Sequence, residues 1–84
     1  MRYYIFKTII PNDGELKEIH KELLGRRCYI VELEAGKRAI IRYEPDYDPG
    51  DFHLVSTSIV KNYTDDNGVC TIWTENTTYY LEAA

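Results

Sequence analysis

The residues most able to do chemistry form an acidic segment in the second half of the chain. Its members are Glu44, Asp46, Tyr47, Asp48 and Asp51. Three carboxylates at this spacing share only a faint likeness with a calcium loop, since Pro49 interrupts the spacing and no glutamate takes the closing position of an EF-hand loop. We therefore expect no metal and no cofactor. Two interpretations remain: a solvated polar loop, or a surface that recognises arginine and lysine side chains.

Charge is divided unequally along the chain. Residues 1–42 carry nine basic and six acidic side chains, net +3, whereas residues 43–84 carry one basic and eight acidic side chains, net −7. Following a phosphate backbone requires clustered lysine and arginine, so we do not expect direct nucleic-acid binding. The sequence instead predicts a protein partner with a basic surface. The predicted contact residues are Glu44, Asp46, Tyr47, Asp48, Asp51, Asp65 and Asp66.

Nucleophile and base types are present in His20, His53, Cys28 and Cys70, but their spacing matches no catalytic pattern. A triad needs residues within hydrogen-bond reach of one another and an oxyanion site, and the sequence identifies neither. We expect no catalytic residues and no enzyme activity. The two cysteines are interpreted as reduced core thiols, with a disulfide as the alternative.

Basic residues of the first half could form a cluster. If the strands around Gly36 pair as a hairpin, Arg27 and Arg38 are expected to lie near each other. A solvated face is the favoured interpretation, since Glu32 and Glu34 belong to the same hairpin. A second possibility is a pocket in which Tyr43 stacks a base and Arg42 pairs a phosphate.

Hydrophobic periodicity predicts the elements that carry these residues. Residues 1–10 read as a strand that is apolar on both faces, and residues 13–24 as a helix with an apolar stripe. Residues 27–82 read as antiparallel strands, with a bend near 56–58 and a hairpin turn at Asn67 and Gly68. The expected fold is α+β, mostly β: a small antiparallel barrel or roll of five to six strands, SH3-like or OB-like, with one N-terminal helix.

Length and composition predict one domain over residues 1–84. No apolar run approaches the roughly 20 residues that span a bilayer, so we expect a cytoplasmic protein that makes no membrane contact. Tyrosine is abundant, with eight copies. Adjacent tyrosines in a strand point to opposite faces, so one of Tyr3 and Tyr4, and one of Tyr79 and Tyr80, is expected outside the core. Such exposed tyrosines suggest a homodimer.

Four short patterns carry a resemblance. They are Gly36-x-x-Ala39-Ile40-Ile41, Ser56-Thr57-Ser58-x-Val60, Asp66-Asn67-Gly68 and Thr74-x-Asn76-Thr77-x-Tyr79. Over a little more than half its length, the chain resembles small SH3-like β-barrel proteins of bacteriophages and bacterial mobile elements. The resemblance implies a barrel and a genomic setting rich in small acidic proteins that inhibit host defence nucleases or sequester their signals.

The hypothesis from sequence is therefore a non-enzymatic binding protein. It would act as a phage or mobile-element inhibitor of a host defence system, in the manner of an anti-CRISPR protein, through its acidic surface. The alternatives are a sponge for a nucleotide signal and a structural dimerisation module.

Overall fold

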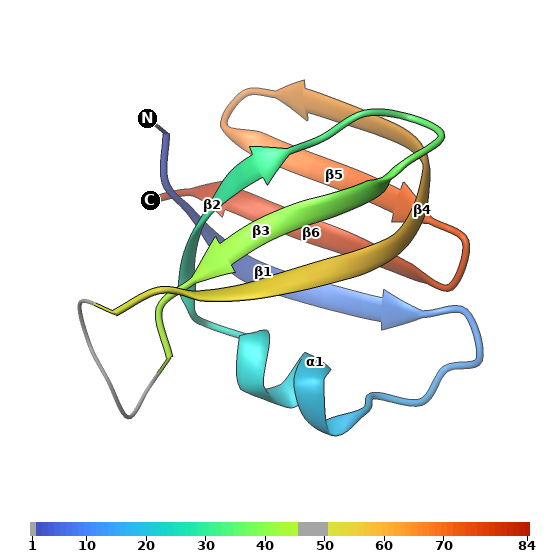
Figure 1. The fold of residues 1–84 in the computed structure, drawn as a ribbon, viewed down its shortest axis with the longest axis horizontal. Coiled ribbons are helices and arrows are strands. Elements are labelled where there is room, and N and C mark those ends of the chain that lie inside the picture. Colours follow the sequence, from blue (N-terminus) through green and yellow to red (C-terminus); the bar gives the residue numbers. More distant parts are fainter. Residues whose placement is uncertain (1, 46–50) are drawn as a thin grey trace.

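The computed structural model describes residues 2–45 and 51–84 as a closed antiparallel barrel with one short helix. The predicted small antiparallel barrel is confirmed, with six strands in the described residues. Each strand pairs with its neighbour in sequence, and β1 also pairs with β6 to close the barrel (Figure 1). The strands are β1 (Tyr4–Pro11), β2 (Arg27–Glu32), β3 (Arg38–Tyr43), β4 (His53–Asp66), β5 (Val69–Thr74) and β6 (Thr77–Ala83), and the helix is α1 (Glu18–Leu23).

The sequence of strand β1 has apolar residues at both odd and even positions, so its alternation alone does not show which side chains face inward. A β-bulge determines this. The register with β6 shifts between Phe6 and Thr8, so that Lys7 is the extra residue. Tyr4 and Phe6 are buried before the bulge, and Ile9 is buried after it. A bulge moves the following side chains to the opposite face, so this strand buries residues of both parities.

Strand β4 is shared between two parts of the barrel. Its first half pairs with β3 and its second half, from Val60, pairs with β5. Figure 1 shows it curving around one side of the barrel between these partners. The predicted bend near residues 56–58 falls where one residue of β3, Ala39, lies opposite two residues of β4, Thr57 and Ser58. Such bulges increase local twist and curvature.

The helix is shorter than the predicted range of residues 13–24. Asp13 belongs to a turn, since its Oδ1 accepts a hydrogen bond from the Glu15 amide at 3.0 Å and the Gly14 amide donates to the Pro11 carbonyl. Gly14 has φ 77°, which ends any helical path there. The helix begins at Glu18. The helical turns that are present, Glu18–Leu23, contain the buried residues His20 and Leu23.

The β2–β3 hairpin corrects one expectation from sequence. Its register places Cys28 opposite Tyr43, so Arg27 lies at the end near Glu44 while Arg38 pairs with Ile59 of β4. In an antiparallel hairpin, residues near the start of one strand oppose residues near the end of the other. Arg27 and Arg38 therefore lie at opposite ends of the hairpin and form no common basic cluster.

The core fills the barrel interior with one set of apolar side chains. Both cysteines are free and buried within it, as the favoured interpretation predicted. A fully buried Phe, Leu or Ile side chain contributes roughly 1.5–3 kcal/mol relative to an exposed one. The largest side chains with almost no exposure are Phe6, Leu23, Ile41, Ile72 and Leu81.

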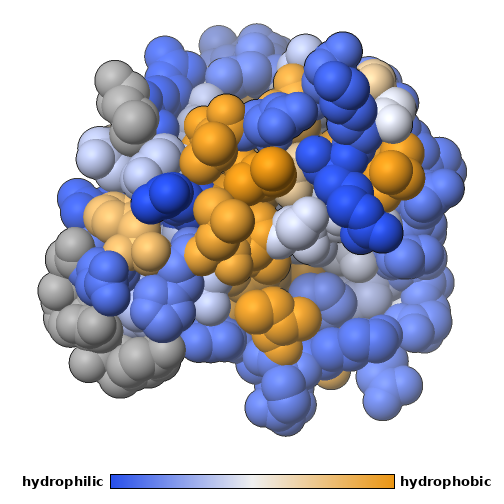
Figure 2. Space-filling view, viewed as in Figure 1, coloured by the Kyte–Doolittle hydropathy of each residue, from blue (hydrophilic) through white to orange (hydrophobic). Residues whose placement is uncertain are grey.

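The outer face of β2, β3 and β4 keeps apolar side chains in solvent. Val31 is 52% exposed and Leu54 is 60% exposed. Figure 2 shows apolar side chains gathered near the middle of this face. Tyr4 and Tyr79 are buried whereas Tyr3 and Tyr80 are partly exposed, as the strand alternation predicted. Within residues 2–45 and 51–84, no helix has the length and hydropathy needed to cross a membrane.

Candidate functional site: a cleft between α1 and β4

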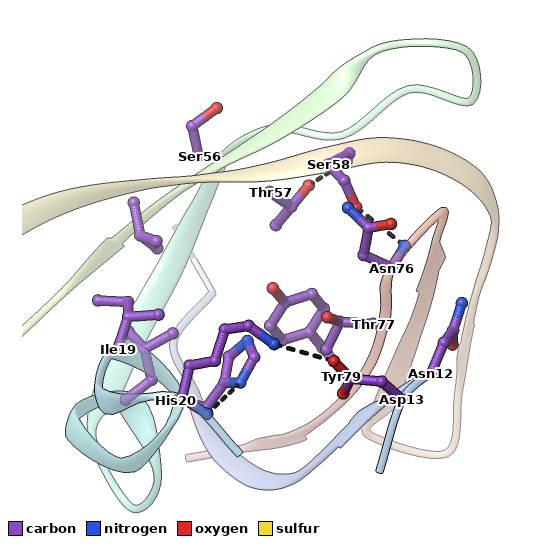
Figure 3. Close-up of a pocket in the computed structure, with 13 residues that line it drawn as sticks. Asn12, Asp13, Ile19, His20, Ser56, Thr57, Ser58, Asn76, Thr77 and Tyr79 are labelled. Carbon is purple, nitrogen blue, oxygen red and sulfur yellow. Dashed lines mark hydrogen bonds and ion pairs between the residues drawn. The ribbon is translucent and has the colours of Figure 1, made fainter. Parts of the chain in front are cut away.

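A cleft of about 490 Å³ lies between α1 and the first half of β4. Strand β1 pairs with β2 only at Tyr4 and Ile5. The buried residues of α1, His20 and Leu23, line the cleft. Figure 3 shows the helix on one side of this α1–β4 cleft, β4 above it and the β5–β6 turn on the other side. Segments distant in sequence therefore meet here. The volume is within the usual range for small-molecule sites.

The two sides of the cleft differ in polarity. Ile19, Leu23 and Val55 supply apolar lining, and Ile19 of α1 keeps 39% of its surface exposed. Asn12 and Asn76 lie on the opposite side, at the β1–α1 loop and the β5–β6 turn (Figure 3). A small set of polar groups facing an apolar wall is typical of sites that orient a small organic ligand.

His20 and Tyr79 lie side by side in the cleft, with ring centroids 6.4 Å apart. The His20 Nδ1 accepts a hydrogen bond from the Lys17 backbone amide at 3.1 Å, which ties the ring to the start of α1. An accepting Nδ1 carries no proton, so the neutral ring carries its proton on Nε2. Burial, followed by the charge of Lys17, lowers the pKa of His20 from its ordinary value. The imidazole is thus a neutral donor.

Tyr79 supplies the aromatic surface and a hydroxyl. Figure 3 shows its ring near the centre of the cleft, close to Thr77. Burial raises the pKa of Tyr79, and a smaller opposing effect, which lowers this pKa, comes from a hydrogen bond with the Thr77 side chain. The phenol therefore stays protonated at neutral pH and can donate a hydrogen bond.

A network of hydroxyl groups braces β4 beside the cleft. The Ser58 hydroxyl donates to the Thr74 hydroxyl at 2.8 Å, and the Thr74 hydroxyl donates to the Thr77 carbonyl at 2.6 Å. The Asn76 backbone amide donates to the Ser58 hydroxyl at 3.2 Å. These bonds fix the β5–β6 turn against β4, so the polar side of the cleft is held in place before any ligand binds.

Charged groups occur only at the mouth among the residues that line the cleft. Lys17 Nζ lies 3.2 Å from Asp13 Oδ2, and both side chains are more than half exposed. This pair is worth little to stability because water screens it. It does leave the mouth without net charge.

The acidic residues predicted to form one surface are placed at both ends of β4. Asp46, Tyr47 and Asp48 lie outside the described residues. Asp51 is exposed, with its Oδ2 3.9 Å from His53 Nε2. Asp66 is exposed at the far end of the strand, and beside it Asp65 accepts a 2.8 Å hydrogen bond from the Tyr4 hydroxyl. None of the described acidic residues in this set lines the cleft.

Glu44 belongs to a compact cluster of its own. Its Oε2 lies 3.0 Å from an Arg27 guanidinium nitrogen. The same guanidinium lies 4.8 Å from the centroid of the Tyr3 ring and 5.7 Å from that of the Phe52 ring. Arg27 is therefore engaged by one carboxylate and two aromatic faces of the same chain.

The suggested pocket of Arg42 and Tyr43 is not assembled in the structure. These neighbours point to opposite faces of β3: Arg42 is exposed, whereas Tyr43 is 5% exposed and belongs to the core. Neither lines the α1–β4 cleft. Sequence reasoning missed this cleft because its lining comes from three separated segments. The one available signal was the apolar stripe of the helix.

Comparison of the chain with protein-family models, with curated proteins and with solved structures found no match. The residues described here also contain no group of three or more histidine, cysteine, aspartate or glutamate side chains able to hold a metal ion. The case for function therefore rests on the geometry of the cleft.

Proposed function

We propose that this protein is a non-enzymatic binding protein whose ligand site is the α1–β4 cleft. The observation that carries the proposal is the cleft itself, about 490 Å³ and lined by both apolar and polar side chains. Among residues 2–45 and 51–84, no protein group forms a hydrogen bond with the amide side chain of Asn76 or with the Nε2–H of His20. Polar groups without protein partners are available to a ligand.

A thermal-shift screen with a library of small organic fragments tests this proposal. Asn76→Trp should fill the cleft, since the side chain lies at its polar side and makes no recorded side-chain hydrogen bond. Glu75→Trp, in the same turn but outside the cleft lining, is the matched control. We expect fragments that stabilise the natural chain and Glu75→Trp but not Asn76→Trp. Equal stabilisation of all three proteins would place binding elsewhere and refute the site.

A second candidate function is the acidic protein-binding surface predicted from sequence, including the inhibition of a host defence system. The observation that favours it is the exposure of Asp51 and Asp66 in the described residues. Charge reversal of both, to lysine, should abolish capture of a basic partner from bacterial lysate and should leave the thermal stability unchanged. Retained capture of the same partner would remove this surface from consideration.

We also propose that the barrel is SH3-like and not OB-like. The supporting observation is the strand order, in which every strand pairs with its neighbour in sequence. An OB barrel has Greek-key connections, which place strands beside partners that are not consecutive.

A further inference from the structure

We infer that the α1–β4 cleft takes an uncharged ring compound, of the nucleoside or neutral sugar class, with an apolar face and a hydrogen-bonding edge. This inference rests on the proposed function and names the ligand class of the same site. The expected ligand carries no phosphate, and in this it differs from the nucleotide signal suggested by the sequence. Three features of the cleft support it: its charge balance, its donors and its opposed walls.

The charge balance disfavours a ligand with a strong negative charge. Lys17 is the cation among the lining residues, and Asp13 holds it at 3.2 Å. The His20 ring is neutral because its Nδ1 accepts a hydrogen bond from a backbone amide. A phosphate in the cleft would lose hydration and meet no uncompensated cation, which makes its transfer from water costly.

The donors match a neutral partner that accepts hydrogen bonds. His20 offers its Nε2 proton, Tyr79 its hydroxyl, and Asn76 both a donor and an acceptor on its amide. These groups come from α1, β6 and the β5–β6 turn, and Figure 3 shows them around one space. Neutral hydrogen bonds give specificity to hydroxyl and amide groups without a counter-ion.

The opposed walls favour a ring over a chain. Ile19 presents an apolar surface from α1, and Asn76 lies across the cleft from it (Figure 3). Val55 and the almost completely buried Leu23 add further apolar lining. A nucleobase or a sugar has an apolar face and a polar edge, so it can satisfy both walls at once. A flexible chain would lose more conformational entropy for the same contacts.

The first experiment compares matched pairs that differ by one phosphate. Isothermal titration calorimetry and saturation-transfer NMR would measure the natural chain with adenosine against AMP, and with glucose against glucose 6-phosphate. We expect at least one uncharged member to bind about tenfold or more tightly than its phosphorylated partner. Phosphorylated members that bind equally well or better would overturn the ligand class while leaving the site intact.

Variants tie the result to the cleft. Tyr79→Phe removes only the hydroxyl and should weaken binding about five- to tenfold, the usual effect of losing one hydrogen bond. Asn76→Ala tests a second donor independently if Tyr79→Phe does not fold. Asn76→Trp should abolish binding, and Glu75→Trp should leave it unchanged. Uncharged ligands that bind all these variants alike would also overturn the inference.

One further variant tests the charge argument directly. Asp13→Asn keeps the Oδ1 acceptor for the Glu15 amide but removes the negative charge beside Lys17. It should shift the preference toward the phosphorylated member of each pair, and an unchanged preference would refute the argument. Fragments that bind in a cleft-dependent way, with no binding from either matched pair, would refute the ligand class alone. No binding from fragments or pairs would refute the proposed function as well.

Discussion

We expect the hydroxyl of Thr57 to contribute more to the free energy of unfolding than most other polar groups of the chain. The side chain is 3% exposed, and its Oγ1 accepts a 3.0 Å hydrogen bond from the Ala39 amide and donates to the Ser58 carbonyl at 2.7 Å. Ala39 lies opposite the bulge of β4, where ladder bonding is interrupted. The threonine hydroxyl therefore replaces a missing backbone partner in a buried position.

Thr57→Val keeps the shape and the β-branching but removes this hydroxyl. The buried Ala39 amide would lose its acceptor, at a cost of about 1–3 kcal/mol. A destabilisation of about 2 kcal/mol corresponds to a Tm lower by roughly 8–16 °C in a domain of this size. Calorimetry and urea unfolding would measure both quantities.

Thr64→Val is the matched control for this change. Thr64 lies on the same strand, is exposed, and makes no recorded side-chain hydrogen bond. Its substitution should alter the free energy of unfolding by less than about 0.5 kcal/mol. If the two variants lose equal stability, the hydroxyl of Thr57 does not act as the amide's partner and the reasoning about the bulge is wrong.

Three other outcomes follow from local structure. Asn67 has φ 52°, so Asn67→Ala should cost about 1 kcal/mol in urea unfolding while Asn67→Gly stays nearly neutral. Burial raises the pKa of Cys28 to about 12 and that of Cys70 to about 11, so Ellman's reagent at pH 8 should modify them slowly in the folded chain and rapidly in guanidinium chloride; fast native reaction would contradict their burial. Because the pKa of His20 is lowered, the folded state binds fewer protons at this site than the unfolded state does. The neutral His20 therefore contributes its full stability above the ordinary pKa of 6.5, and this contribution is lost as the pH falls through the lower pKa of the folded state. Urea unfolding from pH 7 to pH 5 should show this loss, and His20→Gln should make it smaller.

The Asn67–Gly68 turn and the inward face of β3 could be predicted because they depend on neighbouring residues. Asn67 and Gly68 favour a tight hairpin turn by their backbone preferences, and Ala39 and Ile41 alternate as inward residues should. The helix start was harder, because Asp13 can either cap a helix or hold a turn. Its hydrogen bond to the Glu15 amide settles this in favour of the turn.

The cleft and the charge pairs could not be predicted because they depend on register and tertiary placement. In the sequence, His20 is one polar residue of a helix. Its role in the cleft depends on the Lys17 amide, which fixes its tautomer, and on Tyr79, which is distant in sequence and packs beside it. Arg27 likewise pairs with Glu44 only because the hairpin register places them at the same end. A shift in such pairing moves every facing partner.

The pairing of β1 with β6 has a consequence for how the chain folds. Tyr4 lies opposite Ala83, and the Ala84 amide donates to the Tyr3 carbonyl at 3.0 Å. The strands from β2 to β6 can join through local hairpins, whereas β1 gains its β6 contacts only after nearly the whole chain has closed into a loop. Loop closure of this length is entropically costly and slows folding. The meander from β2 to β6 can therefore form first, with β1 docking late as the strand that seals the barrel. Until it docks, the unpaired edges of β6 and β2 are the surfaces by which two copies could exchange their first strands.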